Sequence, residues 1–69
     1  MKRLAIIGAG VLAKQFYNIN TVSKQYTIVG FFDDNKSKEE TVLDLPILGA
    51  ISSIEATYKN GQFDCVLMA

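Results

Sequence analysis

The sequence predicts an α/β fold in which a small parallel sheet is covered by two helices, and three observations support this prediction. The chain begins with a continuously apolar segment, residues 4–7, followed by a glycine turn and a helical pattern. A second apolar segment, residues 26–32, ends in two aspartates. A third, residues 64–68, follows a short helical stretch. Strand and helix patterns that alternate in this way are typical of parallel sheets with helices on their faces.

The first strand and helix are predicted from apolar spacing. Residues 4–7 are apolar at every position, as in a central parallel strand that is buried on both faces. After the glycine turn at residues 8–10, large apolar residues recur at helical spacing on two neighbouring lines: Leu12, Phe16 and Ile19, and Val11 and Val22. We therefore expect an amphipathic helix that ends near residues 21–24.

The middle of the chain predicts a second strand and a short edge strand. Residues 26–32 are rich in β-branched and aromatic side chains, and residues 33–35 have turn chemistry. Residues 36–41 are charged or polar and are expected in solvent. Residues 45–49 are too few for a central strand, and Pro46 lacks an amide donor, so we expect a sheet edge or an ordered loop there.

A short second helix and a last strand complete the predicted fold. Ser52 and Glu55 have the spacing of a capping box, and Asn60-Gly61 predicts a left-handed stop after Lys59. We expect the last strand beside the first, opposite the second, with the Pro46 segment outside the second strand. The result is a Rossmann-like three-layer unit with three main strands, a short edge strand and two helices.

Composition limits the classes of function. The chain has 69 residues, of which 49% are hydrophobic, enough for one small domain over residues 1–69. Seven basic residues balance seven acidic ones, which argues against nucleic-acid or membrane-surface binding. The absence of histidine excludes a histidine base or metal ligand within this chain.

The cellular setting is inferred from cysteine and hydropathy. The one cysteine, Cys65, excludes an intramolecular disulfide and fits a reducing compartment. No apolar segment approaches the length of a membrane span, so we expect a cytoplasmic protein without membrane contact. Because the sequence ends on an apolar strand, we expect the domain to be part of a longer protein and incomplete without it.

The glycine turn is the first candidate site. Gly8 allows a tight exit from the strand, and Gly10 lets a ligand approach the backbone, with helix-start amides facing a phosphate. Together with Ala13 they match the G-x-G-x-x-A pattern of nucleotide-binding units. The alternative is that both glycines only make a turn.

The second candidate is the acidic pair Asp33 and Asp34. A carboxylate at the end of the second strand can bind ribose hydroxyls or the N–H edge of a uracil. Adjacent residues of a strand point in opposite directions, so we expect one of the two to meet a ligand. In the alternative interpretation both are loop acids, one of which starts an Asx-turn. Gly49 is a further candidate contact that could equally shape a loop.

Three segments together resemble a known family. Residues 2–10, then V-G-F-F-D-D at residues 29–34, then P-I-L-G at residues 46–49 occur in this order. The chain resembles over its whole length the N-terminal domain of bacterial sugar acetyltransferases of the sialic acid O-acetyltransferase and UDP-amino-sugar N-acetyltransferase type, the PglD group.

The resemblance implies a function that composition does not show. It implies a Rossmann-like domain that binds a UDP-linked sugar as the acceptor of an O- or N-acetyl transfer in bacterial surface-polysaccharide synthesis. It further implies a C-terminal left-handed β-helix, absent here, which binds acetyl-CoA, forms a homotrimer and carries the catalytic histidine. This chain would then hold no catalytic residue.

The resemblance also implies which residues bind the substrate. By position these are Gly10, Val11 and Leu12 at the glycine turn, Asp33 and Asp34, and a backbone contact near Gly49. Val11 departs from the family pattern, which usually has glycine there. A branched side chain at this point could narrow the site, change its ligand or leave it empty.

Two other functions compete with this interpretation. The first is the NAD(P)-binding part of an oxidoreductase, or the nucleotide-sugar-binding part of a dehydratase or epimerase. An NAD site needs a single acid at the strand tip and an ordered adenine pocket beyond it. The cytoplasmic part of membrane-anchored nucleotide-sugar dehydratases or epimerases shares the V-G-F-x-D-D and P-x-L-G segments. The second is an assembly domain without a ligand, in which the glycine turn is structural.

Overall fold

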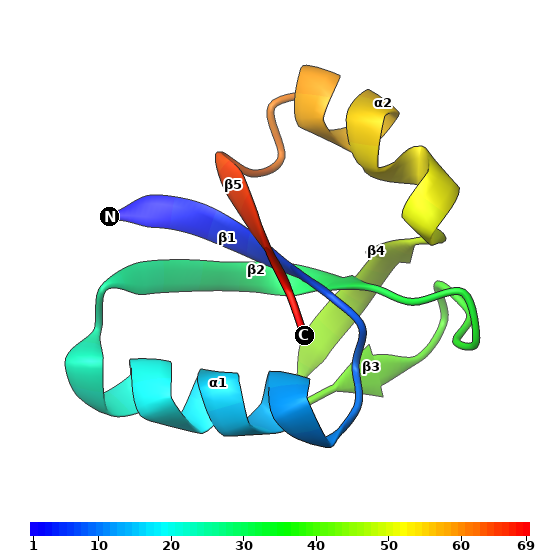
Figure 1. The fold of residues 1–69 in the computed structure, drawn as a ribbon. Helices are drawn as coiled ribbons and strands as arrows, with labels where there is room; N and C mark the ends of the chain where they lie inside the picture. Colours follow the sequence, from blue (N-terminus) through cyan, green and yellow to red (C-terminus); the bar gives the residue numbers. More distant parts are fainter.

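The computed structural model describes all residues of the chain, 1–69, as one five-stranded sheet with helices on both faces (Figure 1). The strands are β1 (Lys2–Ile7), β2 (Tyr26–Phe32), β3 (Thr41–Val42), β4 (Leu45–Gly49) and β5 (Cys65–Met68). Their order is β3-β4-β2-β1-β5, in which β4, β2, β1 and β5 run parallel and β3 is antiparallel to β4. The predicted positions of the last strand beside the first and of the Pro46 segment outside the second strand are confirmed.

The helices α1 (Val11–Ser23) and α2 (Ile54–Lys59), the latter preceded by the short 3-10 turn η1 (Ile51–Ser53), cover opposite faces of the sheet. Leu4 and Ile6 of β1 pack with Ala13 of α1 in the larger apolar cluster. Ala5 lies in a second cluster with Phe32 and Phe63, against which Ile54 of α2 packs. Successive residues of β1 thus face different layers, as the alternation of a strand requires. The length and hydropathy of these helices are insufficient for any of them to span a lipid bilayer.

The buried side of α1 differs from the one that the apolar spacing predicts. Ala13 is fully buried, Phe16 and Tyr17 are half-buried, and the next position on this side, Asn20, hydrogen-bonds both backbone groups of Tyr26. The other large apolar residues of the helix are exposed: Val11, Leu12, Ile19 and Val22. Ala13, Phe16 and Tyr17 lie at helical spacing on the side of α1 that packs against the sheet, so the large apolar residues at other positions project away from it.

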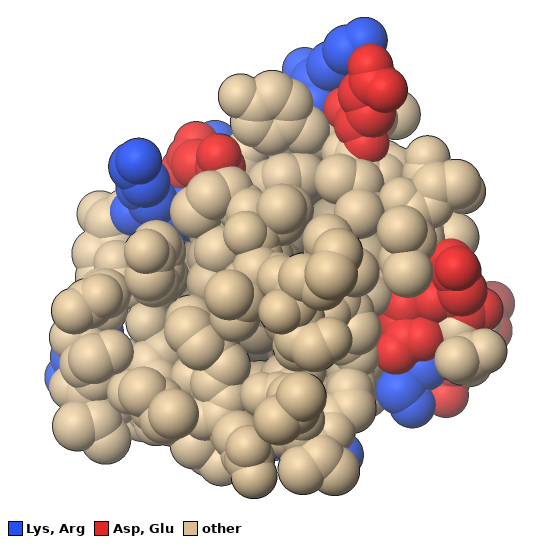
Figure 2. All heavy atoms as spheres, viewed as in Figure 1, with Lys and Arg blue, Asp and Glu red and all other residues tan.

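Many of the hydrophobic residues, which make up 49% of the sequence, therefore lie on the surface. Only 14 of the 69 residues are buried, and large apolar side chains of α1 and β5 are exposed, Met68 by 79%. Figure 2 shows that the centre of the face viewed in Figure 1 carries no charged side chain and that the charges lie along its margins. The balance of charge in the composition is thus accompanied by a neutral surface over this face.

The expectation of a single short edge strand is wrong, because β3 lies outside β4 and makes a fifth strand. The two strands form a hairpin whose turn residues Leu43 and Asp44 both have positive φ, 53° and 64°. Turns of this mirror-image kind are normally signalled by asparagine and glycine. A two-residue strand joined by Leu-Asp carries no such signal, so the sequence did not reveal it.

The predicted capping box is also absent. The segment before α2 is a 3-10 turn, the helix has no side-chain cap, and the Ser53 hydroxyl donates to the Ala50 carbonyl at 2.7 Å. Glu55 instead pairs with Lys59 at 3.0 Å on the exposed side of α2. The predicted end of this helix is confirmed, since α2 ends at Lys59 and Gly61 has a φ of 75°.

Arg3 and Asp64 join the beginning of β1 to the residue before β5. The backbone amide of Arg3 donates to Asp64 Oδ2 at 2.8 Å, and Nη2 of the Arg3 side chain donates to Asp64 Oδ1 at 3.1 Å. In return, the backbone amide of Asp64 donates to the Arg3 carbonyl at 2.8 Å. These bonds set the register of β5 against β1. The hydrogen bond from the Arg3 side chain, followed by the one from its backbone, lowers the pKa of the Asp64 carboxyl from its ordinary value of 3.8.

This lowered pKa predicts a pH-dependent stability. A carboxyl whose pKa is depressed by folding stabilises the folded state above its unfolded pKa, and this contribution is lost as the pH falls through the folded pKa. Asp64→Asn should be less stable than the wild type at neutral pH, and the difference should shrink below pH 3.8. Urea unfolding over a series of pH values measures it. Glu55→Gln, which breaks an exposed pair, is the control with little expected effect, and a pH-independent deficit in Asp64→Asn would contradict the assignment.

The hairpin turn predicts a stabilising substitution. Leu43 and Asp44 occupy left-handed backbone, which costs a residue with a Cβ about 1–2 kcal/mol. The double change Leu43→Asn with Asp44→Gly should therefore raise the free energy of unfolding by about 1 kcal/mol. Urea denaturation at neutral pH measures this, and a less stable double variant would show that the turn geometry is wrong.

Candidate functional site

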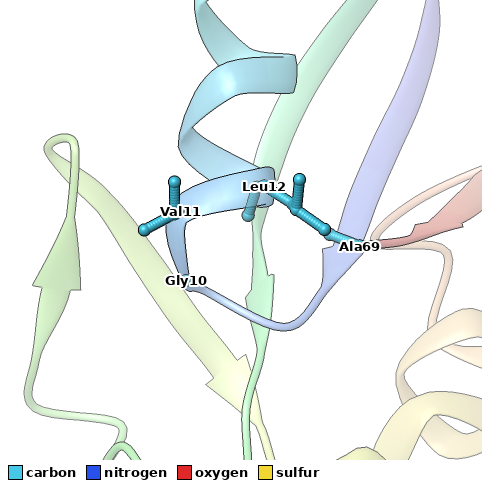
Figure 3. A pocket seen from close by; sticks show the side chains of 5 residues that line it. Gly10, Val11, Leu12 and Ala69 are labelled. Atoms are coloured by element: carbon cyan, nitrogen blue, oxygen red, sulfur yellow. The ribbon is translucent and has the colours of Figure 1, made fainter.

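The candidate site lies at the carboxyl ends of the parallel strands. From β1 the chain crosses to β2 on one side, and from β4 it crosses to β5 on the other, by helices on opposite faces. The two connections diverge between β1 and β5, which is where ligands bind in open α/β sheets. A pocket of about 210 Å³ opens at this point, lined by Gly10, Val11, Leu12, Ala13 and Ala69 (Figure 3).

The two glycines of the turn serve different purposes. Gly8 has a φ of 95°, and its amide donates to the Phe32 carbonyl at 2.7 Å, so this residue makes the tight exit from β1. Gly10 has a φ of −90°, which any residue can adopt, and no atom lies within 4 Å of the place where its Cβ would stand. The missing side chain at Gly10 therefore leaves open space beside the pocket.

The first turn of α1 presents unpaired backbone amides at the pocket. The helix has no side-chain cap and no acidic residue in its first turn, and its first internal hydrogen bond runs from the Lys14 amide to the Gly10 carbonyl at 3.1 Å. The amides of Val11, Leu12 and Ala13 consequently have no partner within the helix. Together with the positive end of the helix dipole, they make an environment that favours an anion.

The side chains of the pocket are apolar and differ in direction. Val11 and Leu12 are exposed by 70% and 65%. In Figure 3 the Leu12 side chain points toward Ala69, at the end of β5, whereas the Val11 side chain points away from it. The residue that leans over the space between α1 and β5 is therefore Leu12, and the branched side chain of Val11 does not fill this space.

Asp33 is bound to the glycine turn by its side chain. Its Oδ2 accepts a hydrogen bond from the Ala9 amide at 3.0 Å, and its Oδ1 accepts one from the Asn35 amide at 2.8 Å. The second bond closes the Asx-turn of the alternative interpretation. Both oxygens of this half-buried carboxylate thus already have backbone donors.

Asp34 points to the other side, toward the segment after β4. Its Oδ1 accepts from the Ile51 amide at 2.8 Å, and the structure shows no protein donor at Oδ2 of this exposed side chain. The two acids therefore diverge, as the alternation of a strand predicts. Asp34 is the one of the pair that keeps an unpaired oxygen in solvent.

Gly49 shapes the chain next to Asp34. It is buried with a φ of 155°, and a Cβ at this position would collide with the Ser53 side chain. Its carbonyl accepts from the Asp33 amide at 3.2 Å. The glycine is thus explained by packing and by the backbone conformation.

The predicted site residues all lie at one edge of the sheet, but only some of them meet. Gly10, Val11 and Leu12 line the pocket together. Gly8 and Asp33 hold the turn that leads into it, whereas Asp34 and Gly49 lie toward β4 and do not line it. Sequence analysis missed Ala9 and Ala69, because the first contributes a backbone amide and the second a position at the end of a strand, and neither has a residue-type signal. The structure contains no group of three or more side chains that could hold a metal ion.

The two glycines of the turn predict a matched pair of substitutions. Gly8→Ala should lower the free energy of unfolding by about 1–2 kcal/mol, because its backbone is left-handed. Gly10→Ala should cost less than about 1 kcal/mol, because its space is open and only its quality as a helix cap changes. Urea unfolding of both variants measures the difference, and equal losses would contradict these separate roles.

Comparison with known proteins identifies the family. The family model described as the PglD N-terminal domain matches residues 3–69. No curated protein and no solved structure matches the chain. The family match confirms the resemblance that the three sequence segments indicate. Because it extends over nearly the whole sequence, the chain belongs to the PglD N-terminal domain family, the N-terminal domains of sugar acetyltransferases.

Proposed function

We propose that this Rossmann-like domain binds a UDP-linked sugar as the acceptor substrate of an acetyl transfer. The observation that carries the proposal is the open pocket at the start of α1, where unpaired amides lie at the point between β1 and β5 from which the connections diverge. The family of the chain supports the same class of substrate. No cation lines the pocket, so the backbone supplies the attraction for a diphosphate.

The nucleoside would lie along the ends of β2 and β4, on the side of Asp34. This carboxylate has one oxygen without a protein donor and is exposed, so it can accept a hydrogen bond from a ribose hydroxyl or from the N–H edge of uracil. The Asp33 carboxylate has both oxygens occupied by backbone amides, which favours Asp34 as the contact. The sugar would then extend toward Leu12 and Ala69.

The domain would contribute binding and orientation to the reaction. An amine or hydroxyl of the sugar would attack the thioester carbonyl of acetyl-CoA and lose a proton to a base, while the carbon–sulfur bond breaks and coenzyme A leaves as the thiol. The family resemblance implies a histidine base, which this chain lacks, and on that ground we assign the base, the acetyl-CoA site and the trimeric assembly to another domain of a longer, cytoplasmic protein. Holding the acceptor in one orientation makes the attack effectively unimolecular.

Thermal-shift titration tests the proposal. UDP or a UDP-amino-sugar at about 100 times its dissociation constant should stabilise the domain by roughly 2.7 kcal/mol. Asp34→Asn should weaken this stabilisation, because it removes the charge of the accepting carboxylate. Asp44→Asn is the matched control. This acid directly precedes β4 and so lies where the parallel strands begin, away from the site at their carboxyl ends.

The other ligands decide between the competing functions. Stabilisation by NAD or NADP and not by UDP compounds would replace the proposal with the oxidoreductase interpretation. A response in Val11→Gly alone would mean that the valine closes the site in this protein. If neither the wild type nor Val11→Gly responds to any nucleotide, the glycine turn is structural and the proposal is wrong.

A further inference from the structure

We infer that Asp33 is a positioning residue, which holds the glycine turn in the conformation that presents the α1 amides to a phosphate and does not itself contact the nucleoside. Its effect on ligand binding rests on the proposed function. The hydrogen bond between the Ala9 amide and Asp33 is independent of the proposed function, because both groups belong to this chain.

The argument begins with the hydrogen bonds that follow β2. The Gly8 amide donates to the Phe32 carbonyl at 2.7 Å, and the next amide, Ala9, donates to Asp33 Oδ2 at 3.0 Å. Two successive amides of the turn are thus held by two successive residues at the end of β2. The side chain of Asp33 continues the attachment after the backbone ladder between β1 and β2 has ended.

The Ala9 amide is the effective place for such an attachment. It stands between Gly8, whose φ is 95°, and Gly10, the residue before α1. Glycines on both sides leave this turn with more conformational freedom than any other residues would. One hydrogen bond at the residue between them limits that freedom and thereby sets where the first turn of α1 begins.

Asp33 has less free acceptor capacity for a direct contact than Asp34, because each of its carboxylate oxygens already has a backbone donor. Its second oxygen accepts from the Asn35 amide at 2.8 Å, and its own amide donates to the Gly49 carbonyl at 3.2 Å. Asp34, the next residue, is bound through one oxygen only. The two neighbouring acids therefore have different tasks: Asp33 acts through Ala9, and Asp34 faces the ligand.

Separate titration of the two halves of the ligand tests this division. Inorganic pyrophosphate and uridine are titrated into Asp33→Ala, Asp33→Asn and Asp34→Asn. Asp33→Ala should weaken pyrophosphate binding by about tenfold, the equivalent of one lost hydrogen bond, and leave uridine binding unchanged. Asp33→Asn keeps a carbonyl acceptor and should restore part of the loss. Asp34→Asn should show the reverse pattern, and loss of uridine binding with intact pyrophosphate binding in Asp33→Ala would overturn the inference.

Amide hydrogen exchange tests the attachment without any ligand. The Ala9 amide should exchange slowly in the wild type, faster in Asp33→Asn and fastest in Asp33→Ala, while the amides of β1 keep their protection. If Asp33→Ala does not fold, Asp33→Asn alone decides, because it must still raise the exchange rate of Ala9. Unchanged exchange of Ala9 would overturn the inference. Failure of the wild type to bind either probe, with the expected exchange pattern, would contradict the proposed function alone.

Discussion

The burial of β1 on both faces is the constraint on which the rest of this structure depends. Ala5 and Ile6 have no exposed surface and lie in different apolar clusters, one on each side of the sheet. A strand buried in this way needs a neighbour on each edge and a helix on each face. β2 and β5 supply the edges, and α1 and α2 cover the faces. In 69 residues this requirement leaves few other arrangements.

The pocket follows from the same constraint. Because the helices lie on opposite faces, the connections after β1 and β4 run in opposite directions, and an opening remains between β1 and β5. The turn after β1 places the first residues of α1 at this opening. In the first turn of α1, Ala13 is buried against the sheet while the adjacent Leu12 projects over the opening. The packing of the core and the shape of the site are therefore set by the same short segment.

Most of the fold and part of the site could be predicted from the sequence. Apolar runs located three of the strands, and the order of the elements indicated the sheet topology. The β3–β4 hairpin was missed because Leu43 and Asp44 adopt left-handed backbone without the residues that usually signal it. The buried side of α1 was mistaken because large apolar side chains dominate a periodicity argument, whereas the residue of the helix that is fully buried is the small Ala13. The predicted capping box did not form because Ser52 lies within a 3-10 turn and Glu55 pairs with Lys59 instead.

The sequence by itself determined the local features of this domain: the apolar strands, the glycine that permits the turn after β1, and two carboxylates at the end of β2. It also carried enough of the family pattern to indicate membership. Only the tertiary structure decided which group each carboxylate binds, since Asp33 and Ala9 are 24 residues apart, and Asp34 and Ile51 are 17. The physical reason is that a residue type states which hydrogen bonds a side chain can make, while the packing of β1 against its neighbours brings one particular amide within reach.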